Sequence, residues 1–243
     1  MPANPDQVAI FKSTLKDLLK GYRFNVKGLY LDDGTILPLP SESSLVGKVV
    51  EVTIKAHLDR KVLAIKGLEF VRGGERSYPD LTIFGSAVGG QRFAVDVKCL
   101  RRDERGKRTK SAMAVATFDA TYFRKPDEPD ANIVAPYNSF DGHLALVALY
   151  DYDDATAKNI ELVLVEKWRV ATRNTASGTR CYVAAVTNIE DLKKEKGSFA
   201  SEEEFNDYWR NVPIKEKKVR TKKPKAPKKP RGAKEAILAS VAP

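Results

Sequence analysis

Residues 78–84 read YPDLTIF and residues 92–100 read RFAVDVKCL, and these two segments decide the fold. Both are rich in β-branched and aromatic residues, and the glycine-containing turn 85–90 separates them at hairpin scale. In the second segment apolar and polar residues alternate, so Asp96 and Lys98 are expected on the same face of a strand. The sequence therefore predicts two neighbouring strands, the second of which carries a charged pair.

The rest of the chain adds helices and strands around this hairpin. An amphipathic helix is predicted near the N-terminus, with an apolar face formed by Val8, Phe11, Leu15, Leu18 and Leu19. A hairpin of strands 22–31 and 35–39 follows, around the turn Asp32-Asp33-Gly34. Further strands are predicted over 62–70, 144–150, 160–165 and 180–186, and a last helix over 202–211. This order predicts an α+β fold with a central mixed β-sheet flanked by helices.

A second helix is predicted after the cap candidates Ser41 and Ser43. Its apolar residues recur at helical spacing, and they are Leu45, Val49, Val52 and His57-Leu58. This helix carries Glu51 next to apolar positions.

The composition is typical of a soluble globular protein. The 243 residues carry a formal net charge of +10, and 42% of them are hydrophobic. No apolar run approaches the ~18 residues of a membrane span, and the N-terminal residues lack the order of a secretory signal. We therefore expect an intracellular protein without a membrane partner. Cys99 and Cys181 are expected to be reduced and buried, and with two histidines the chemistry must rest on carboxylates and lysines.

Most of the excess positive charge lies in one segment near the C-terminus. Residues 215–231 hold ten Lys or Arg residues, one acid and three prolines. Such a segment has almost nothing to bury, so we expect a disordered arm. The sequence thus predicts a folded domain over 1–212 and a Lys/Pro-rich basic tail over 213–243, which attracts nucleic-acid phosphate or serves only solubility.

Asp80 and Asp96 form a candidate metal site. A hard cation such as Mg²⁺ prefers oxygen ligands, and two carboxylates from adjacent strands can hold it together with water and a phosphate oxygen. Lys98 would point at the same volume and stabilise the charge that grows on the phosphorus oxygens. Glu51 could supply a third carboxylate. The competing interpretation is that the charged pair only forms a solvated face of the strand.

Pro79, Asp80, Asp96 and Lys98 match the PD-(D/E)xK nuclease motif. The surrounding chain resembles the type II restriction endonucleases of the EcoRV kind over residues 10–212. The most specific part of this resemblance lies near the end of the domain and comprises GSF at 197–199, SEEEF at 201–205 and DYWRN at 207–211.

The resemblance implies an Mg²⁺-dependent restriction endonuclease that hydrolyses phosphodiester bonds without a covalent intermediate. It implies 5′-phosphate products, typically with blunt ends. The metal would be held by Asp80, Asp96, Glu51 and the carbonyl of Val97, and Lys98 would be the catalytic lysine. The resemblance also implies a cytoplasmic homodimer in a prokaryotic cell, acting on palindromic double-stranded DNA to restrict foreign DNA. A cognate DNA methyltransferase would protect the host as a functional partner.

Two loops are candidates for DNA contacts. By the same resemblance, the first loop would lie along the minor groove, and it consists of Gly74, Glu75, Arg76 and Ser77. The second loop would enter the major groove, and it consists of Ala176, Ser177, Gly178, Thr179 and Arg180. Glycine permits close approach of the backbone, and Ser, Thr and Arg can donate hydrogen bonds to base edges or phosphates. The alternative for the second loop is an ordinary hairpin turn.

Two other functions stay open. A PD-(D/E)xK repair or junction nuclease would select DNA shape rather than sequence. A nonenzymatic DNA-binding protein would use the acids only for structure and the tail for affinity. Defined fragments from long duplex DNA would argue against the first, and metal-dependent cleavage would argue against the second.

Deletion of residues 215–243 should weaken DNA binding and flatten its salt dependence, because each phosphate that the tail neutralises releases counterions. Gel-shift titrations at several salt concentrations measure both effects. A salt slope equal to that of the full chain would show that the tail does not contact DNA.

Overall fold

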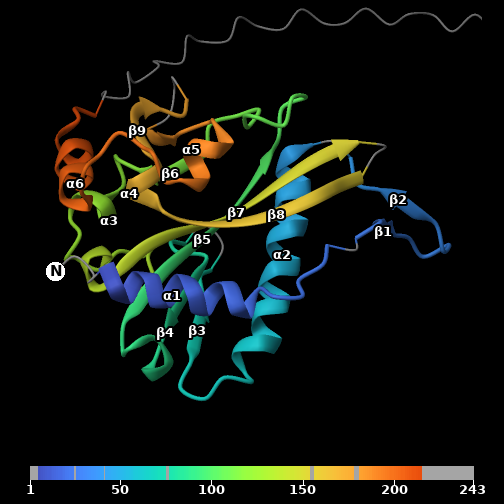
Figure 1. Ribbon diagram of the computed structural model, residues 1–243, viewed down its shortest axis with the longest axis horizontal. Coiled ribbons are helices and arrows are strands. Elements are labelled where there is room, and N and C mark those ends of the chain that lie inside the picture. Colours follow the sequence, from blue (N-terminus) through green and yellow to red (C-terminus); the bar gives the residue numbers. More distant parts are fainter. Residues whose placement is uncertain are drawn as a thin grey trace, which may run out of the picture. The chain divides into compact units, whose positions relative to one another are not determined.

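A mixed five-stranded sheet forms the centre of the fold (Figure 1). The computed structural model describes residues 5–24, 26–40, 42–74, 77–153, 156–177 and 181–214. The strand order is β3-β4-β5-β7-β8, with β5 parallel to β7 and the other neighbours antiparallel. The strands are β3 (Glu69–Arg72), β4 (Leu81–Phe84), β5 (Arg92–Arg101), β7 (Gly142–Asp153) and β8 (Thr156–Glu166).

Two helices cover one face of this sheet, α1 (Pro5–Leu18) and α2 (Ser43–Val62). Because side chains alternate along a strand, Phe93, Val95 and Val97 of β5 all point to this face. They pack in one core with residues of both helices, which are Val8, Phe11, Leu15, Leu18, Val46, Val50, Ile54, Leu58 and Val62. The predicted apolar face of the first helix is confirmed for Val8, Phe11, Leu15 and Leu18, whereas Leu19 follows the end of the helix and is only partly buried.

A smaller, three-stranded sheet and several helices cover the opposite face (Figure 1). Its strand order is β6-β10-β9. The elements on this side are β6 (Ala114–Thr117), β9 (Ala171–Thr175), β10 (Tyr182–Ala185), α3 (Thr121–Arg124), α4 (Lys167–Val170), α5 (Ile189–Lys193) and α6 (Glu202–Asn211). Ala94 of β5 faces this core together with Phe205 and Trp209 of α6. Asp96, two residues after Ala94, therefore points to the same side. The α+β fold with a central mixed sheet flanked by helices is confirmed.

The predicted strand over 62–70 is wrong. Val62 ends α2, and β3 begins only at Glu69. Val62 lies four residues after Leu58, and both are buried on the face of α2 that packs on the sheet. The apolar spacing therefore continues the helix, and Gly67, with φ of 79°, lies in the turn before β3.

The predicted helix that carries Glu51 is confirmed, but its buried face differs from the prediction. Val49 is only partly buried and Val52 is 55% exposed. The buried residues follow a spacing of four and are Val46, Val50, Ile54, Leu58 and Val62. The N-cap residue is Glu42 rather than Ser41 or Ser43.

The predicted N-terminal hairpin is present but shorter than expected. Only β1 (Gly28–Tyr30) and β2 (Ile36–Pro38) pair, so most of the segment 22–31 is not strand. Gly34 has φ of 86° in the turn between them, a conformation that favours glycine. All three residues of β2 are exposed, and an isolated two-stranded hairpin with little buried surface is only marginally stable, which accounts for its limited extent.

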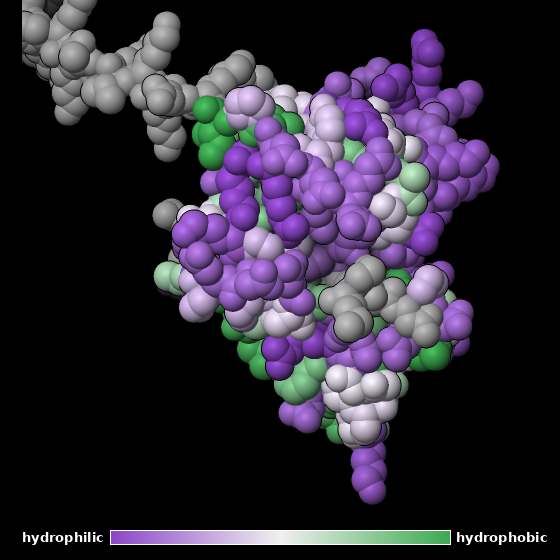
Figure 2. All heavy atoms as spheres, turned by 90° about the vertical axis from the view of Figure 1, so that its left-hand side faces the viewer, coloured by the Kyte–Doolittle hydropathy of each residue, from purple (hydrophilic) through white to green (hydrophobic). Residues whose placement is uncertain are grey.

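Cys99 and Cys181 form no disulfide, and they are only partly buried rather than buried as predicted. Over the described ranges, no helix combines the length and the apolar character needed to cross a membrane. The face of the molecule in Figure 2 is mostly hydrophilic, with small hydrophobic patches. By its contacts the chain divides into Met1–Pro213 and Ile214–Pro243. The expected basic tail from residue 215 onward lies outside the described residues and stays a prediction.

Candidate active site

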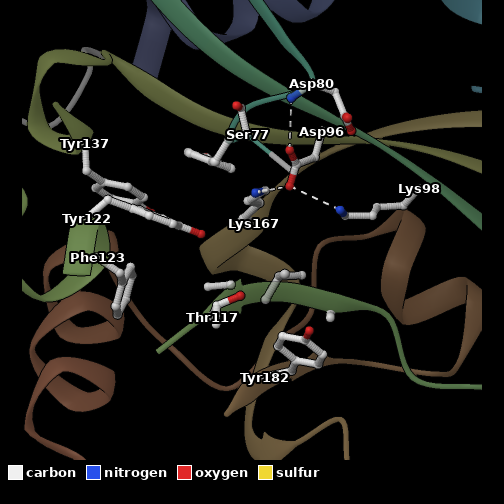
Figure 3. A pocket seen from close by; sticks show the side chains of 14 residues that line it. Ser77, Asp80, Asp96, Lys98, Thr117, Tyr122, Phe123, Tyr137, Lys167 and Tyr182 are labelled. Atoms are coloured by element: carbon white, nitrogen blue, oxygen red, sulfur yellow. Dashed lines mark hydrogen bonds and ion pairs between the residues drawn. The ribbon is translucent and has the colours of Figure 1, made fainter. Parts of the chain in front are cut away.

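Asp80 and Asp96 lie side by side on neighbouring strands (Figure 3). Asp80 directly precedes β4, and the antiparallel register places Leu81 opposite Val95 of β5. The backbone N–H of Asp80 donates to Oδ1 of Asp96 at 3.4 Å, and the N–H of Val97 donates to Oδ2 of Asp80 at 2.8 Å. The structure thus brings together the two carboxylates that the sequence singled out.

Lys98 shares the strand face of Asp96, with its Nζ 3.3 Å from Oδ2 of that residue. Burial alone would lower the pKa of Lys98, but the charges of Asp96 and Asp80 raise the pKa above its ordinary value. Lys98 is therefore an ammonium ion at neutral pH, and it faces both acids.

A second lysine, Lys167, contacts the same oxygen of Asp96. It is the first residue of α4, and its Nζ lies 2.5 Å from Oδ2 of Asp96 in a buried environment. Burial alone would raise the pKa of Asp96, but Lys167 and Lys98 hold it well below its usual range. Burial lowers the pKa of Lys167 to about 8 in spite of the Asp96 charge. Asp96 is thus an ionised carboxylate enclosed by two ammonium groups.

The ammonium group of Lys167 also contacts the ring of Tyr78. Its Nζ lies 4.2 Å from the ring centre of Tyr78. The Tyr78 hydroxyl is 2.6 Å from Nδ1 of His143, which stacks on Tyr137 with 3.8 Å between ring centres. Burial, assisted by the charge of Lys167, lowers the pKa of His143 to about 3, so this imidazole is neutral at neutral pH.

Lys55 links Glu51 to Asp80. Oε1 of Glu51 accepts hydrogen bonds from Lys48 at 2.9 Å and from Lys55 at 2.6 Å, and Nζ of Lys55 is also 3.3 Å from Oδ1 of Asp80. Burial alone would raise the pKa of Glu51, but the two lysines lower the pKa below its ordinary value. The contact with Lys55 follows from helix geometry, since residues four apart share a face.

A cavity of about 280 Å³ lies between the two sheets, and its charged lining residues are Asp80, Asp96, Lys98 and Lys167 (Figure 3). Its other walls include Ser77, Thr117, Tyr122, Tyr137 and Tyr182. The two aspartates supply hard oxygen donors of the kind that Mg²⁺ prefers, with room for water or a phosphate to complete its shell. Within the described ranges, no group of three or more His, Cys, Asp or Glu side chains could hold a metal. The donor set therefore fits a site built on two carboxylates.

The structure describes each candidate DNA-binding loop only in part. In the first loop, the N–H of Ser77 donates to the carbonyl of Gly74 at 3.2 Å. In the second, the N–H of Ala176 donates to the carbonyl of Tyr182 at 2.8 Å, and Ser177 follows. Ser77, the last residue of the first loop, lines the cavity, and so does Tyr182, whose carbonyl accepts from Ala176 of the second loop. The residues that lie outside the described ranges are Glu75, Arg76, Gly178, Thr179 and Arg180.

A mixed sheet that carries two aspartates and a lysine at an open cavity has the arrangement of a restriction-endonuclease-like nuclease. The family described as "Restriction endonuclease EcoRV" matches residues 20–228 of the sequence. The chain therefore belongs to the EcoRV restriction endonuclease family, and it is a nuclease of the type II restriction class.

One curated relative agrees with this assignment. The type II restriction enzyme EcoRV of Escherichia coli is 22% identical over 210 residues, which cover 78% of this chain and 82% of that enzyme. Among solved structures, the NlaIV restriction endonuclease is similar with a TM-score of 0.49 and 15% identity, over 86% of this chain and 79% of that chain. The predicted resemblance to type II restriction endonucleases of the EcoRV kind is confirmed by the family match and by EcoRV itself.

Sequence reasoning did not assign Lys55, Tyr122 or Lys167 to the site. Lys55 could have been found from its spacing of four residues to Glu51 on a predicted helix. Lys167 lies two residues after the β-rich segment 160–165, with Glu166 between them, at a position where charged residues signal the end of a strand. Nothing in its own neighbourhood reveals that it pairs with an acid 71 residues away.

Replacement of Lys167 by Met should strongly destabilise the protein, because it leaves Asp96 buried with one partner fewer. We expect a loss of about 3–5 kcal/mol in the free energy of unfolding, the usual result of breaking a buried pair. Lys98→Met, which removes a partner that is 32% exposed, should cost less. The double variant Lys167→Met/Asp96→Asn should recover part of the loss, since no unpaired charge remains. Chemical denaturation measures all four proteins, and equal costs for the two lysines would contradict the assignment.

The buried His143 predicts a loss of stability in mild acid. In the unfolded chain its pKa is about 6.5, whereas in the folded protein it is about 3. Between these values the unfolded state binds more protons, so the stabilising contribution falls as the pH falls, by up to about 1.4 kcal/mol per pH unit. Urea midpoints between pH 7 and pH 4.5 measure this slope. The His143→Gln variant should show a flatter profile, and an unchanged slope would assign the acid sensitivity to other groups.

Proposed function

We propose that this protein is an Mg²⁺-dependent, site-specific endonuclease that hydrolyses phosphodiester bonds in palindromic double-stranded DNA. The observation that supports this most is the position of Asp80, Asp96 and Lys98 at one open cavity on adjacent strands. A solvated strand face would leave these groups exposed, but Asp96 is 7% exposed and enclosed by lysines.

Asp80, Asp96 and the carbonyl of Val97 would hold the Mg²⁺ ion. When bound, such an ion lowers the pKa of a water molecule and offsets charge on a phosphate oxygen. The chain keeps the carboxylates in position for this: the N–H of Val97 holds Oδ2 of Asp80, and Lys167 holds Oδ2 of Asp96. Oδ1 of Asp96 accepts a hydrogen bond from the backbone N–H of Asp80.

Lys98 would orient the attacking water and stabilise the negative charge that develops on the phosphorus oxygens. The water adds to phosphorus in line with the 3′ oxygen, the bond from phosphorus to that oxygen breaks, and the 3′ oxygen takes a proton. The products are a 5′-phosphate and a 3′-hydroxyl. Thr117 and Tyr182 line the wall opposite Asp96, and their hydroxyls would donate to the DNA backbone (Figure 3).

The proposed active unit is a homodimer, because a two-fold protein matches a two-fold DNA site. Each protomer would cut one strand, at positions that leave blunt ends. The loop of residues 74–77 would follow the minor groove, and the loop of residues 176–180 would enter the major groove. The protein would act on foreign DNA in the cytoplasm of a prokaryotic cell, with a cognate methyltransferase protecting the host.

Replacement of Asp96 by Asn should abolish cleavage, whereas DNA binding by the folded variant should stay largely intact. Circular dichroism shows whether the variant is folded, because loss of this charge leaves Lys167 buried without its partner. The amide keeps the shape of the side chain but removes the charge that would hold the metal. We expect a loss of roughly a thousandfold or more, since metal-assisted charge stabilisation contributes several kcal/mol and about 1.4 kcal/mol corresponds to a factor of ten. The assay is digestion of phage-sized duplex DNA with Mg²⁺ or with EDTA, followed by sequencing of the fragment ends.

Asp17→Asn, a change at a largely exposed acid of α1, serves as the control and should cut normally. Discrete Mg²⁺-dependent fragments with a common end sequence are the expected result for the wild type. Cleavage by Asp96→Asn at the normal rate would refute the metal assignment. A smear would favour a structure-selective nuclease, and intact DNA with a gel shift would favour a DNA-binding protein.

A further inference from the structure

Lys55 forms a bridge between the helix acid and the first aspartate of the site. Its Nζ lies 2.6 Å from Oε1 of Glu51 and 3.3 Å from Oδ1 of Asp80, and its side chain is 12% exposed. These are distances of N–H···O hydrogen bonds, whereas Mg²⁺ holds its oxygen ligands at about 2.0–2.1 Å. The ammonium group therefore occupies the space in which a cation shared by Glu51 and Asp80 would lie.

The position of Lys55 is set by the folded core. Glu51 precedes Lys55 by four residues on α2, the orientation in which such pairs are most favourable. Ile54 and Leu58 fix the same helix on the sheet that carries the site. The bridge thus joins two elements of the core and does not depend on a loop.

The charges of the site also favour one divalent ion. Its three carboxylates, of Glu51, Asp80 and Asp96, are matched by the ammonium groups of Lys55, Lys98 and Lys167, and the exposed Lys48 also contacts Glu51. Each divalent ion adds two positive charges at short range to this balanced group. A second ion between Glu51 and Asp80 would lie against the Lys55 ammonium, and like charges a few ångströms apart in a partly buried site repel strongly.

We propose that Lys55 is a built-in cation that takes the place of a second divalent ion, so that each active site binds one divalent ion, at Asp80 and Asp96. Glu51 is then the positioning residue of Lys55 rather than a metal ligand. This inference rests on the proposed function, from which it takes the two aspartates as the metal site.

The number of Mn²⁺ ions bound by the full chain without DNA tests the proposal. Electron paramagnetic resonance of free Mn²⁺ gives the count directly and requires no cleavage. We expect one ion per wild-type chain and two for Lys55→Met, because the vacated space then lies between two carboxylates. Lys48→Met is the matched control, since Lys48 contacts the same oxygen of Glu51 but is 65% exposed, and it should keep a count of one.

Glu51 provides an independent test in the same assay. Glu51→Gln should keep one ion, and the double variant Lys55→Met/Glu51→Gln should return from two ions to one. Two ions on the wild type, one ion on a folded Lys55→Met chain, or loss of an ion in Glu51→Gln would each overturn the proposal. Circular dichroism shows whether Lys55→Met is folded, and if it is not, the count for Glu51→Gln decides.

These outcomes separate the inference from the proposed function. A count of two for the wild type overturns the role of Lys55 but leaves a metal-dependent nuclease. A count of zero overturns the assignment of Asp80 and Asp96 as the metal site, and the role of Lys55 with it.

Discussion

The contact between Asp96 and Lys167 is the interaction on which the site depends. A carboxylate in the middle of a central strand is surrounded by core residues, and burying it without a partner would cost several kcal/mol. Lys167 supplies that partner from the end of β8, and the ring of Tyr78 lies against its ammonium group. Tyr78 in turn contacts His143 of β7. The ion pair, the ring contact and the hydrogen bond together link the segment before β4 to β5, to β7 and to the residue that follows β8.

The alternation along β5 explains how one strand serves both core and site. Phe93, Val95 and Val97 point to α1 and α2, while Asp96 and Lys98 point to the space under the smaller sheet. Because packing on the helices already stabilises the apolar face of β5, its polar face can line an open cavity while the sheet stays intact. The same packing holds α2 at the distance where Lys55 reaches Asp80. The alternation of side chains along β5 thus determines both how the sheet packs on the helices and where the site lies.

The period of two also explains what the sequence could predict. Asp80, Asp96 and Lys98 belong to one local hairpin, so alternation and turn length were enough to bring them together. The pairing of Lys167 with Asp96 spans 71 residues and follows from strand order, which local patterns do not encode. The segment 62–70 was misassigned because Val62 fits both a strand and the continuing spacing of a helix. The strands β6 and β9 were not predicted, although they are no shorter than β4 and β10.

The balance of charges in the site bears on how it is assembled. Structural zinc domains need the metal to fold, because their ligands would otherwise be left unpaired. Here each carboxylate already has an ammonium partner, so the domain can fold before any ion arrives. A divalent ion at the proposed site would then add positive charge that the site itself does not offset. A phosphodiester in the cavity would supply the missing negative charge, so metal and DNA should strengthen each other's binding by the reciprocity of linked equilibria.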